Sequence, residues 1–110
     1  FNDYDREIAL ILQDTFSGHI LGVGRLSKLP GQHSIGTFRV MIADACQRKG
    51  LGTLMVQKLQ HVARTEGMSL LRTLLHEDNH GLRRICERLG FEIQPSRQYP
   101  GYLNITWQVN

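Results

Sequence analysis

Short apolar runs separated by polar turns fill the first 43 residues of the chain. In the third run, Phe38, Val40 and Ile42 alternate with the more mixed side chains between them, so they fall on one face of a strand. Turn-forming residues, among them Gly18, Pro30 and Gly31, interrupt the runs. The pattern predicts three strands, at residues 8–12, 19–26 and 34–43.

The apolar spacing becomes helical from Gly50 onward. One stripe recurs at intervals of three and four residues, and Gly67 stands where a left-handed C-terminal cap is expected. This stripe predicts a main helix over 50–66. A second helix is predicted between a capping Asp78 or Asn79 and Gly90. Its apolar stripe consists of Leu82, Ile85, Cys86 and Leu89.

Three further strands are predicted around these helices, at residues 69–75, 91–93 and 102–109. Each helix is long enough for a right-handed crossover, so the middle of the sheet should be parallel, whereas the first three strands should form an antiparallel meander. We therefore expect an α/β (α+β) fold, in which helices flank a mixed, twisted sheet of about six strands.

Composition limits the class of protein. The chain has 110 residues, which suits one small domain, and its longest apolar run, Ile8 to Leu12, is far shorter than the roughly 20 residues that cross a bilayer. Cys46 and Cys86 lack the spacing of a metal or redox pair, so we expect a cytoplasmic protein without a metal site. A net charge of +3 is too small to indicate nucleic acid. Because the chain starts at Phe1, without an initiator Met, we expect residues 1–110 to be one domain from a longer chain.

The most informative segment lies between the third strand and the main helix and reads Gln47-Arg48-Lys49-Gly50-Leu51-Gly52. The first turn of a helix presents backbone N–H groups without intrahelical partners, and glycine lets a ligand approach that backbone. With two basic side chains beside it, this turn favours a diphosphate. The alternative is that the glycines only permit a tight turn and that the basic pair is solvated.

Two other phosphate motifs are excluded. The chain has no GxxxxGK[ST] segment, and Gly22-Val23-Gly24 continues into Arg25 instead of a third glycine at a helix start.

The segment 47–52 resembles the Q/R-x-x-G-x-G/A signature of the GCN5-related N-acetyltransferase (GNAT) family, at the place where that family carries it. Downstream, the segment from Asn79 to Phe91 is similar to the family's helix that runs into Leu-Gly-Phe. The segments 3–9 and 20–23 look like the C-terminal acetyltransferase domain of bacterial protein lysine acetyltransferases. The resemblance covers the chain from the family's second strand onward, without its first strand and first two helices.

The resemblance implies that acetyl-CoA binds where two parallel strands separate, with the thioester near Ala43. The pantetheine arm would bond to the backbone of the third strand, and the diphosphate to the N–H groups of the helix start. Asn79 matches a residue that bonds the cofactor in the family, although it is equally suited to be a simple helix cap. The expected cofactor-binding residues are Val40, Met41, Ile42, Gln47, Arg48, Lys49, Gly50, Leu51, Gly52, Thr53 and Asn79.

The catalytic residues depart from the family pattern. Thr37 occupies the position of a family glutamate, and Cys86 that of a family tyrosine acid. A lysine amine must lose its proton before it attacks, and of the candidates near the cleft we favour His76 as the base, over Glu77, Asp78 and His33. The alternatives are that His76 is an ordinary exposed residue and that Cys86 belongs to the core. The basic residues Arg83, Arg84 and Arg88 are expected on the solvated outer face of the second helix.

Two functions from different classes follow from these features. The first is an N-acetyltransferase that transfers an acetyl group from acetyl-CoA to an amine, either a protein lysine or a small amine. The second is an acyl-CoA-binding regulatory module with little or no activity, suggested by Thr37 and Cys86. We expect no nucleic acid and no membrane partner, and we keep a homodimer open. The loop with Tyr99 and Tyr102 is a candidate for the acceptor side.

Overall fold

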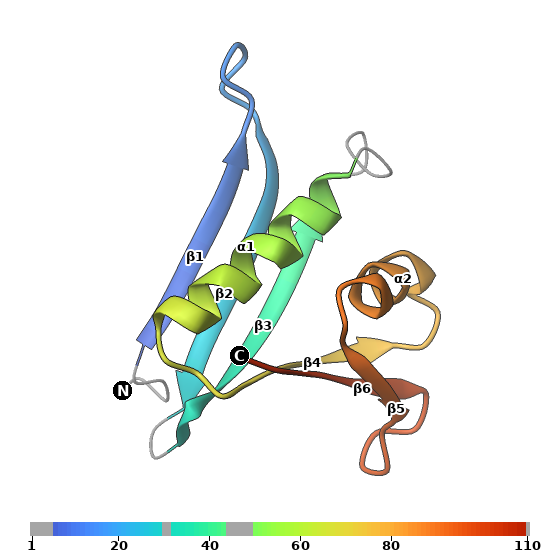
Figure 1. The fold of residues 1–110 in the computed structure, drawn as a ribbon. Helices are drawn as coiled ribbons and strands as arrows, with labels where there is room; N and C mark the ends of the chain where they lie inside the picture. Colours follow the sequence, from blue (N-terminus) through green and yellow to red (C-terminus); the bar gives the residue numbers. More distant parts are fainter. Residues whose placement is uncertain (1–5, 30–31, 44–49, 110) are drawn as a thin grey trace.

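The computed structural model describes residues 6–29, 32–43 and 50–109. They form one six-stranded sheet with two helices on one of its faces (Figure 1). The elements are β1 (Arg6–Gln13), β2 (Ile20–Leu29), β3 (Gln32–Ile42), α1 (Leu51–Thr65), β4 (Leu70–His76), α2 (His80–Arg88), β5 (Glu92–Pro95) and β6 (Tyr102–Gln108). The predicted fold class and order of elements are confirmed.

The strands lie in the order β1-β2-β3-β4-β6-β5. The meander of β1, β2 and β3 is antiparallel, as predicted, and β3 pairs with β4 in parallel. One detail differs from the expectation: the strand that follows α2 does not lie beside β4. Instead β6 pairs antiparallel with all seven residues of β4, and β5 forms the edge. The reason is that β5 has only four residues, whereas β6 is long enough to cover the whole edge of β4.

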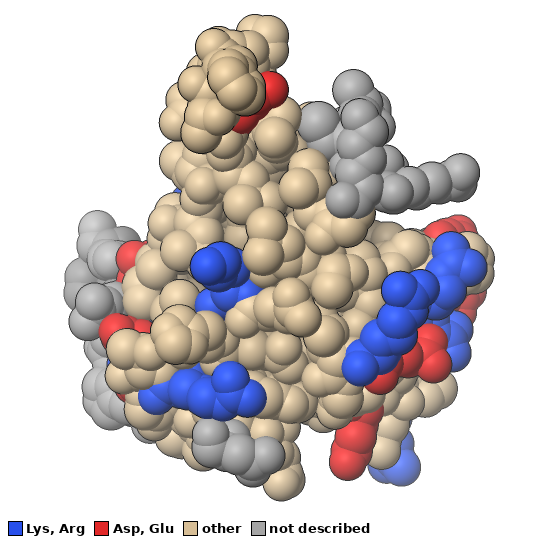
Figure 2. Space-filling view, turned by 45° about the horizontal axis from the view of Figure 1, so that its top comes forward, with Lys and Arg blue, Asp and Glu red and all other residues tan. Residues whose placement is uncertain are grey.

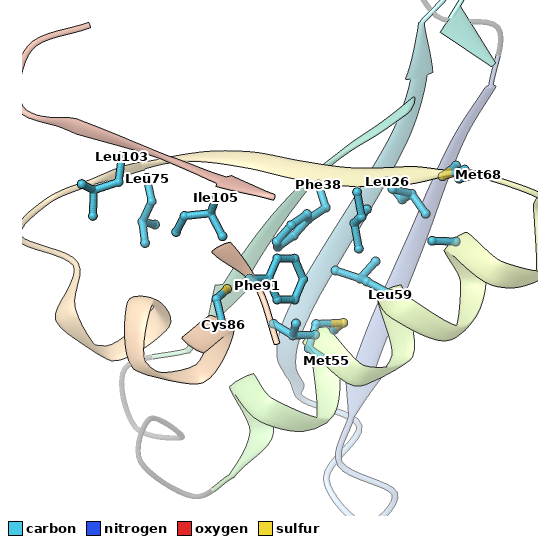
Figure 3. Close-up of a cluster of buried hydrophobic side chains, with 13 residues drawn as sticks. Leu26, Phe38, Met55, Leu59, Met68, Leu75, Cys86, Phe91, Leu103 and Ile105 are labelled. Carbon is cyan, nitrogen blue, oxygen red and sulfur yellow. The ribbon is translucent and has the colours of Figure 1, made fainter. Parts of the chain in front are cut away.

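The core fills the space between the sheet and the two helices (Figure 3). Phe38 from β3, Met55 and Leu59 from α1, and Ile105 from β6 are fully buried there. Cys86 of α2 and Phe91 extend the same cluster toward β4 and β6. Because both helices contribute to one cluster, their positions over the sheet are fixed together. Within the described residues, neither helix is long and apolar enough to cross a membrane.

Glycines in the strands let α1 lie close to the sheet. A Cβ on Gly24 would stand 2.5 Å from the Met55 Sδ and 3.0 Å from its Cγ, closer than real atoms approach. A Cβ on Gly36 would likewise meet Met68 and Leu26. Gly24, excluded above as part of a dinucleotide motif, thus makes room for the helix that carries the signature turn.

We expect Gly24→Ala to lower the free energy of unfolding by about 1–3 kcal/mol, because the added methyl group overpacks the contact with Met55. Chemical denaturation measures this loss. Gly81→Ala is the matched control, since a Cβ there meets nothing within 4 Å and the residue lies inside α2. Its stability should stay the same or rise slightly. Equal stability of both variants would contradict the close packing of α1 on β2.

Candidate active site

Two parallel strands separate in the middle of the sheet. The ladder between β3 and β4 comprises only the pairs from Ile35–Leu70 to Thr37–Arg72. Both strands continue, β3 to Ile42 and β4 to His76, but in diverging directions (Figure 1). A wedge therefore opens beyond the third pair, at the carboxyl ends of both strands.

Part of the backbone of β3 faces this wedge. Ala43 N–H donates to the Leu21 C=O at 2.8 Å, which directs the odd-numbered groups of β3 toward β2. Backbone groups alternate along a strand, so the N–H and C=O of Val40 and Ile42 face the side of β4. Met41 faces the other way, and its side chain is 73% exposed. Val40 and Ile42 thus turn their backbone groups toward the wedge, whereas the backbone of Met41 does not face it.

The start of α1 presents uncapped backbone donors. Gly50 is the N-cap residue with a φ of 78°, a left-handed conformation that favours glycine, and no side chain caps the helix. The first helical bond runs from Leu54 N–H to the Gly50 C=O at 3.1 Å, so the N–H groups of Leu51, Gly52 and Thr53 have no acceptor within the helix. The first turn also carries no acidic side chain that would neutralise it. The other three predicted residues of this turn, Gln47, Arg48 and Lys49, lie outside the described residues.

The start of α2 faces the start of α1. The Asn79 Oδ1 accepts a hydrogen bond of 3.3 Å from Leu82 N–H, so this residue does cap α2. Its side-chain NH₂ group is still a donor, since an amide carries both functions. The two helices are in contact: a Cβ on Gly52 would stand 2.8 Å from the Ile85 Cδ1. Glycine at position 52 therefore lets the start of α1 lie against Ile85, in the middle of α2.

These parts line one cavity of about 790 Å³, which is within the range of small-molecule sites. The cavity brings together the end of β3, the glycine turn and the start of α2. Of the predicted residues it includes Val40, Ile42, Gly50, Gly52, Thr53 and Asn79. The remaining lining residues are Asp78, His80, Gly81, Leu82, Arg84, Ile85 and Arg88. Another cavity, of about 490 Å³, lies at the opposite end of β3 and β4, and its lining residues include no titratable side chain.

Two arginines of α2 belong to the cavity. Arg84 and Arg88 are exposed, as expected, and both also line the cavity, which was not expected. Arg83 is partly buried, and its Nε lies 3.4 Å from the Glu87 carboxylate. Figure 2 shows basic side chains, with acidic ones beside them, on the side of the molecule where α2 lies. The missed signal was the spacing of His80, Arg84 and Arg88, which share one helix face.

His76 lies at the end of β4 and is not among the residues that line the cavity. Its Nδ1 accepts a hydrogen bond of 3.1 Å from Asp78 N–H, and its ring meets Tyr102 edge-on at 5.1 Å. An Nδ1 that accepts this bond belongs to a neutral ring with the proton on Nε2. The Asp78 Oδ2 lies 3.5 Å from the same Nδ1.

Cys86 is completely buried, in contact with the core around Phe91 (Figure 3). Burial in these apolar surroundings raises the pKa of the Cys86 thiol to about 12. A thiol with this pKa is a poor proton donor to a thiolate whose own pKa is near 8.5, as a reference thiol has. The placement favours the packing role of Cys86 over its role as an acid.

Comparison with known proteins agrees with this architecture. Residues 1–91 match the model of the acetyltransferase (GNAT) family. The chain therefore belongs to the acetyltransferase (GNAT) family, as the motifs of the sequence suggested.

Solved structures of the same fold include several acetyltransferases. The Salmonella typhimurium protein yncA, solved with its cofactor acetyl-CoA, is 20% identical with a TM-score of 0.74 over 84% of this chain and 60% of its own. The GNAT domain of S. lividans PAT is 15% identical with a TM-score of 0.80 over 98% of this chain and 64% of its own. A variant of spermidine N-acetyltransferase SpeG from Vibrio cholerae is 15% identical with a TM-score of 0.79 over 94% of this chain and 66% of its own. At these identities the likeness concerns the fold, and the chain spans about two thirds or less of each relative.

The Cys86 thiol should stay neutral and unreactive well above pH 9 in the folded protein. In a Cys46→Ser variant, which leaves Cys86 as the only thiol, we expect alkylation to be slow near pH 9 and rapid after denaturation. Because the folded pKa of about 12 exceeds the ordinary value of 9.0, burial of this thiol contributes stability that is complete below pH 9.0 and is lost as the pH rises toward 12. Rapid alkylation of the native protein would contradict the burial.

Proposed function

We propose that this chain binds acetyl-CoA in the cavity between β3 and the two helix starts and transfers the acetyl group to an amine. The observation that carries the proposal is the meeting of three donor sets in one cavity: the outward backbone of β3, the uncapped turn of α1 and the amide of Asn79. A molecule with a diphosphate at one end and an amide-rich arm at the other matches all three. Membership of the acetyltransferase family supports the same assignment.

Each part of the cofactor has hydrogen-bonding partners in the cavity. The diphosphate would accept hydrogen bonds from the N–H groups of Gly52 and Thr53, with Arg48 and Lys49 as further basic partners from the signature. The pantetheine arm would pair with the backbone of β3 at Val40 in the manner of an added strand. The Asn79 NH₂ would donate to a carbonyl of that arm while its Oδ1 keeps the helix cap.

The transfer itself is an attack of a neutral amine on the thioester carbon, with loss of the CoA thiolate. The Val40 N–H, which points into the wedge, would polarise the thioester oxygen as negative charge develops on it. An amine with a pKa near 10.4 is protonated at neutral pH, so a base must take its proton. We assign this role to His76; because its ring lies outside the cavity, the proton would reach it through a bridging water molecule.

The acceptor is an amine, with a protein lysine and a small amine as the two candidates. The likeness of segments 3–9 and 20–23 to bacterial protein lysine acetyltransferases supports the lysine. The spermidine enzyme has the same fold at a similar TM-score, so the fold supports a small amine equally well. A cytoplasmic location, a homodimer and one domain from a longer chain remain predictions from the sequence.

A second candidate function is binding of an acyl-CoA without turnover. One observation favours it: Cys86, at the position of the family's acid, is fully buried with a pKa of about 12. Tight binding of acetyl-CoA with no release of CoA in the presence of amines would support this regulatory role. Release that depends on an added amine would exclude it.

We expect acetyl-CoA to stabilise the folded chain, by about 2.7 kcal/mol at a concentration of 100 times its Kd. Gly50→Leu should abolish the resulting thermal shift, because a side chain in the signature turn fills the space for the diphosphate. Gly67→Leu is the matched control: its φ is 73° against 78° for Gly50, and a Cβ meets nothing within 4 Å at either residue. Both variants should lose similar stability without ligand, but only Gly50→Leu should lose binding. A full shift in Gly50→Leu would contradict the proposed diphosphate site.

His76→Ala should slow the release of CoA to an amine by at least about tenfold, given the usual contribution of a positioned base. Its affinity for acetyl-CoA should not change, since the side chain does not line the cavity. His61→Ala, at an exposed residue of α1, is the control and should turn over as the unchanged chain does. Equal rates for the two variants would remove His76 from the mechanism.

A further inference from the structure

We propose that the Thr73 hydroxyl sets the point at which β3 and β4 separate, and thereby positions the Val40 backbone for the arm that carries the acyl group. This inference rests on the proposed function and assigns a positioning residue to the same site. Thr73 does not line the cavity. It acts through Phe38, two residues before Val40 on the same strand.

A hydrogen bond between a side chain and the backbone joins the two strands just where the ladder ends. The Thr73 Oγ1 donates to the Phe38 C=O at 2.8 Å. Thr73 is 8% exposed and Phe38 is fully buried, so water does not compete for this bond. The last pair of the parallel ladder, Thr37–Arg72, directly precedes both residues.

The hydroxyl takes the place of a backbone donor. In a parallel ladder that continued in the same register, the Leu74 N–H would donate to the Phe38 C=O. Leaving this buried carbonyl without a donor would be unfavourable, which normally holds the strands together. Because the Thr73 hydroxyl satisfies it, the main chain of β4 can turn away after Arg72.

The point at which the strands separate decides whether the Val40 backbone is accessible. Its N–H and C=O point to the same edge of β3 as the Phe38 C=O. A wedge that opens at Phe38 leaves this next pair of groups accessible to a ligand. Without the hydroxyl, the Phe38 C=O would attract the Leu74 N–H or a water molecule, and the wedge would open at a different place.

The other end of the same strand pair provides a matched control. The Ser69 Oγ donates to the Ser34 C=O at 3.1 Å, again from a side chain on the β4 side to the backbone of the β3 side. This bond lies before the first ladder pair, Ile35–Leu70, and far from the wedge. The Ser34 C=O also accepts a bond of 2.7 Å from the Ser69 N–H, so this carbonyl keeps a backbone donor when the hydroxyl is removed. Ser69→Ala therefore controls for the loss of a hydroxyl between the two strands without affecting their separation.

The experiment measures binding of two ligands by Thr73→Val, Thr73→Ser and Ser69→Ala. The ligands are acetyl-CoA and adenosine 3′-phosphate 5′-diphosphate, the nucleotide half of coenzyme A without its pantetheine arm. We expect Thr73→Val, a change of nearly equal shape, to weaken acetyl-CoA binding by about tenfold, the value of one or two lost hydrogen bonds. Its affinity for the nucleotide should stay unchanged. Thr73→Ser should restore acetyl-CoA binding, and Ser69→Ala should behave as the unchanged chain.

The NMR signal of the Phe38 carbonyl reports directly on its hydrogen bond with Thr73. Phe38-Arg39 is the only Phe-Arg step in the sequence, so a chain with carbonyl-labelled Phe and amide-labelled Arg gives one paired NMR signal, from the Phe38 C=O. This signal should shift in Thr73→Val and stay in place in Ser69→Ala. Thr73→Ala, which removes the same hydroxyl, provides the same comparison if Thr73→Val does not fold.

The outcomes separate the two proposals. If the unchanged chain does not bind acetyl-CoA, the proposed function fails, and the role of Thr73 fails with it. If the unchanged chain binds but folded Thr73→Val binds acetyl-CoA equally well, only the role of Thr73 is overturned. A loss that is equal for both ligands also overturns it, since a general loosening of the site would then explain the result.

Discussion

Backbone pairing between β3 and β4 stops after three residue pairs, although both strands continue for several residues. Had the ladder continued, the N–H and C=O of Val40 would be consumed within the sheet, and no extended ligand could bond there. Its early end leaves backbone groups of a buried strand at the edge of a cavity. The glycine turn of α1 and the start of α2 then close the cavity around this edge.

Much of this architecture could be predicted because it depends on local patterns. The alternation around Phe38 and the stripe of α1 each reflect one buried face. The positive φ of Gly50 and Gly67 explains why glycine stands just before and just after the α1 helix. The cofactor residues expected on β3 came from the resemblance to the family, and the alternation of the strand directs the Val40 backbone toward the wedge. The same alternation turns the Met41 backbone away from the wedge. The motif does not specify this direction, so it included Met41 among the cofactor residues.

The remaining features depend on contacts between distant segments. The insertion of β6 between β4 and β5 results from competition for one strand edge, which no single segment determines. Arg84 and Arg88 line the cavity only because the fold brings α2 beside the end of β3 and the start of α1. The surroundings of the catalytic candidate were harder to predict, because the hydrogen bond to the His76 ring depends on a turn that brings Asp78 N–H to its Nδ1. The high pKa of Cys86 similarly depends on how completely the core encloses it.

The contact between Gly52 and Ile85 links the signature turn to the facing helix. The missing side chain at position 52 leaves room for the Ile85 Cδ1, and both residues line the cavity. A methyl group at position 52 requires only this terminal atom to turn aside, in line with the Gly-or-Ala alternative of the signature. A bulky residue at position 52 is therefore expected only beside a smaller residue at position 85, although the two positions lie more than thirty residues apart.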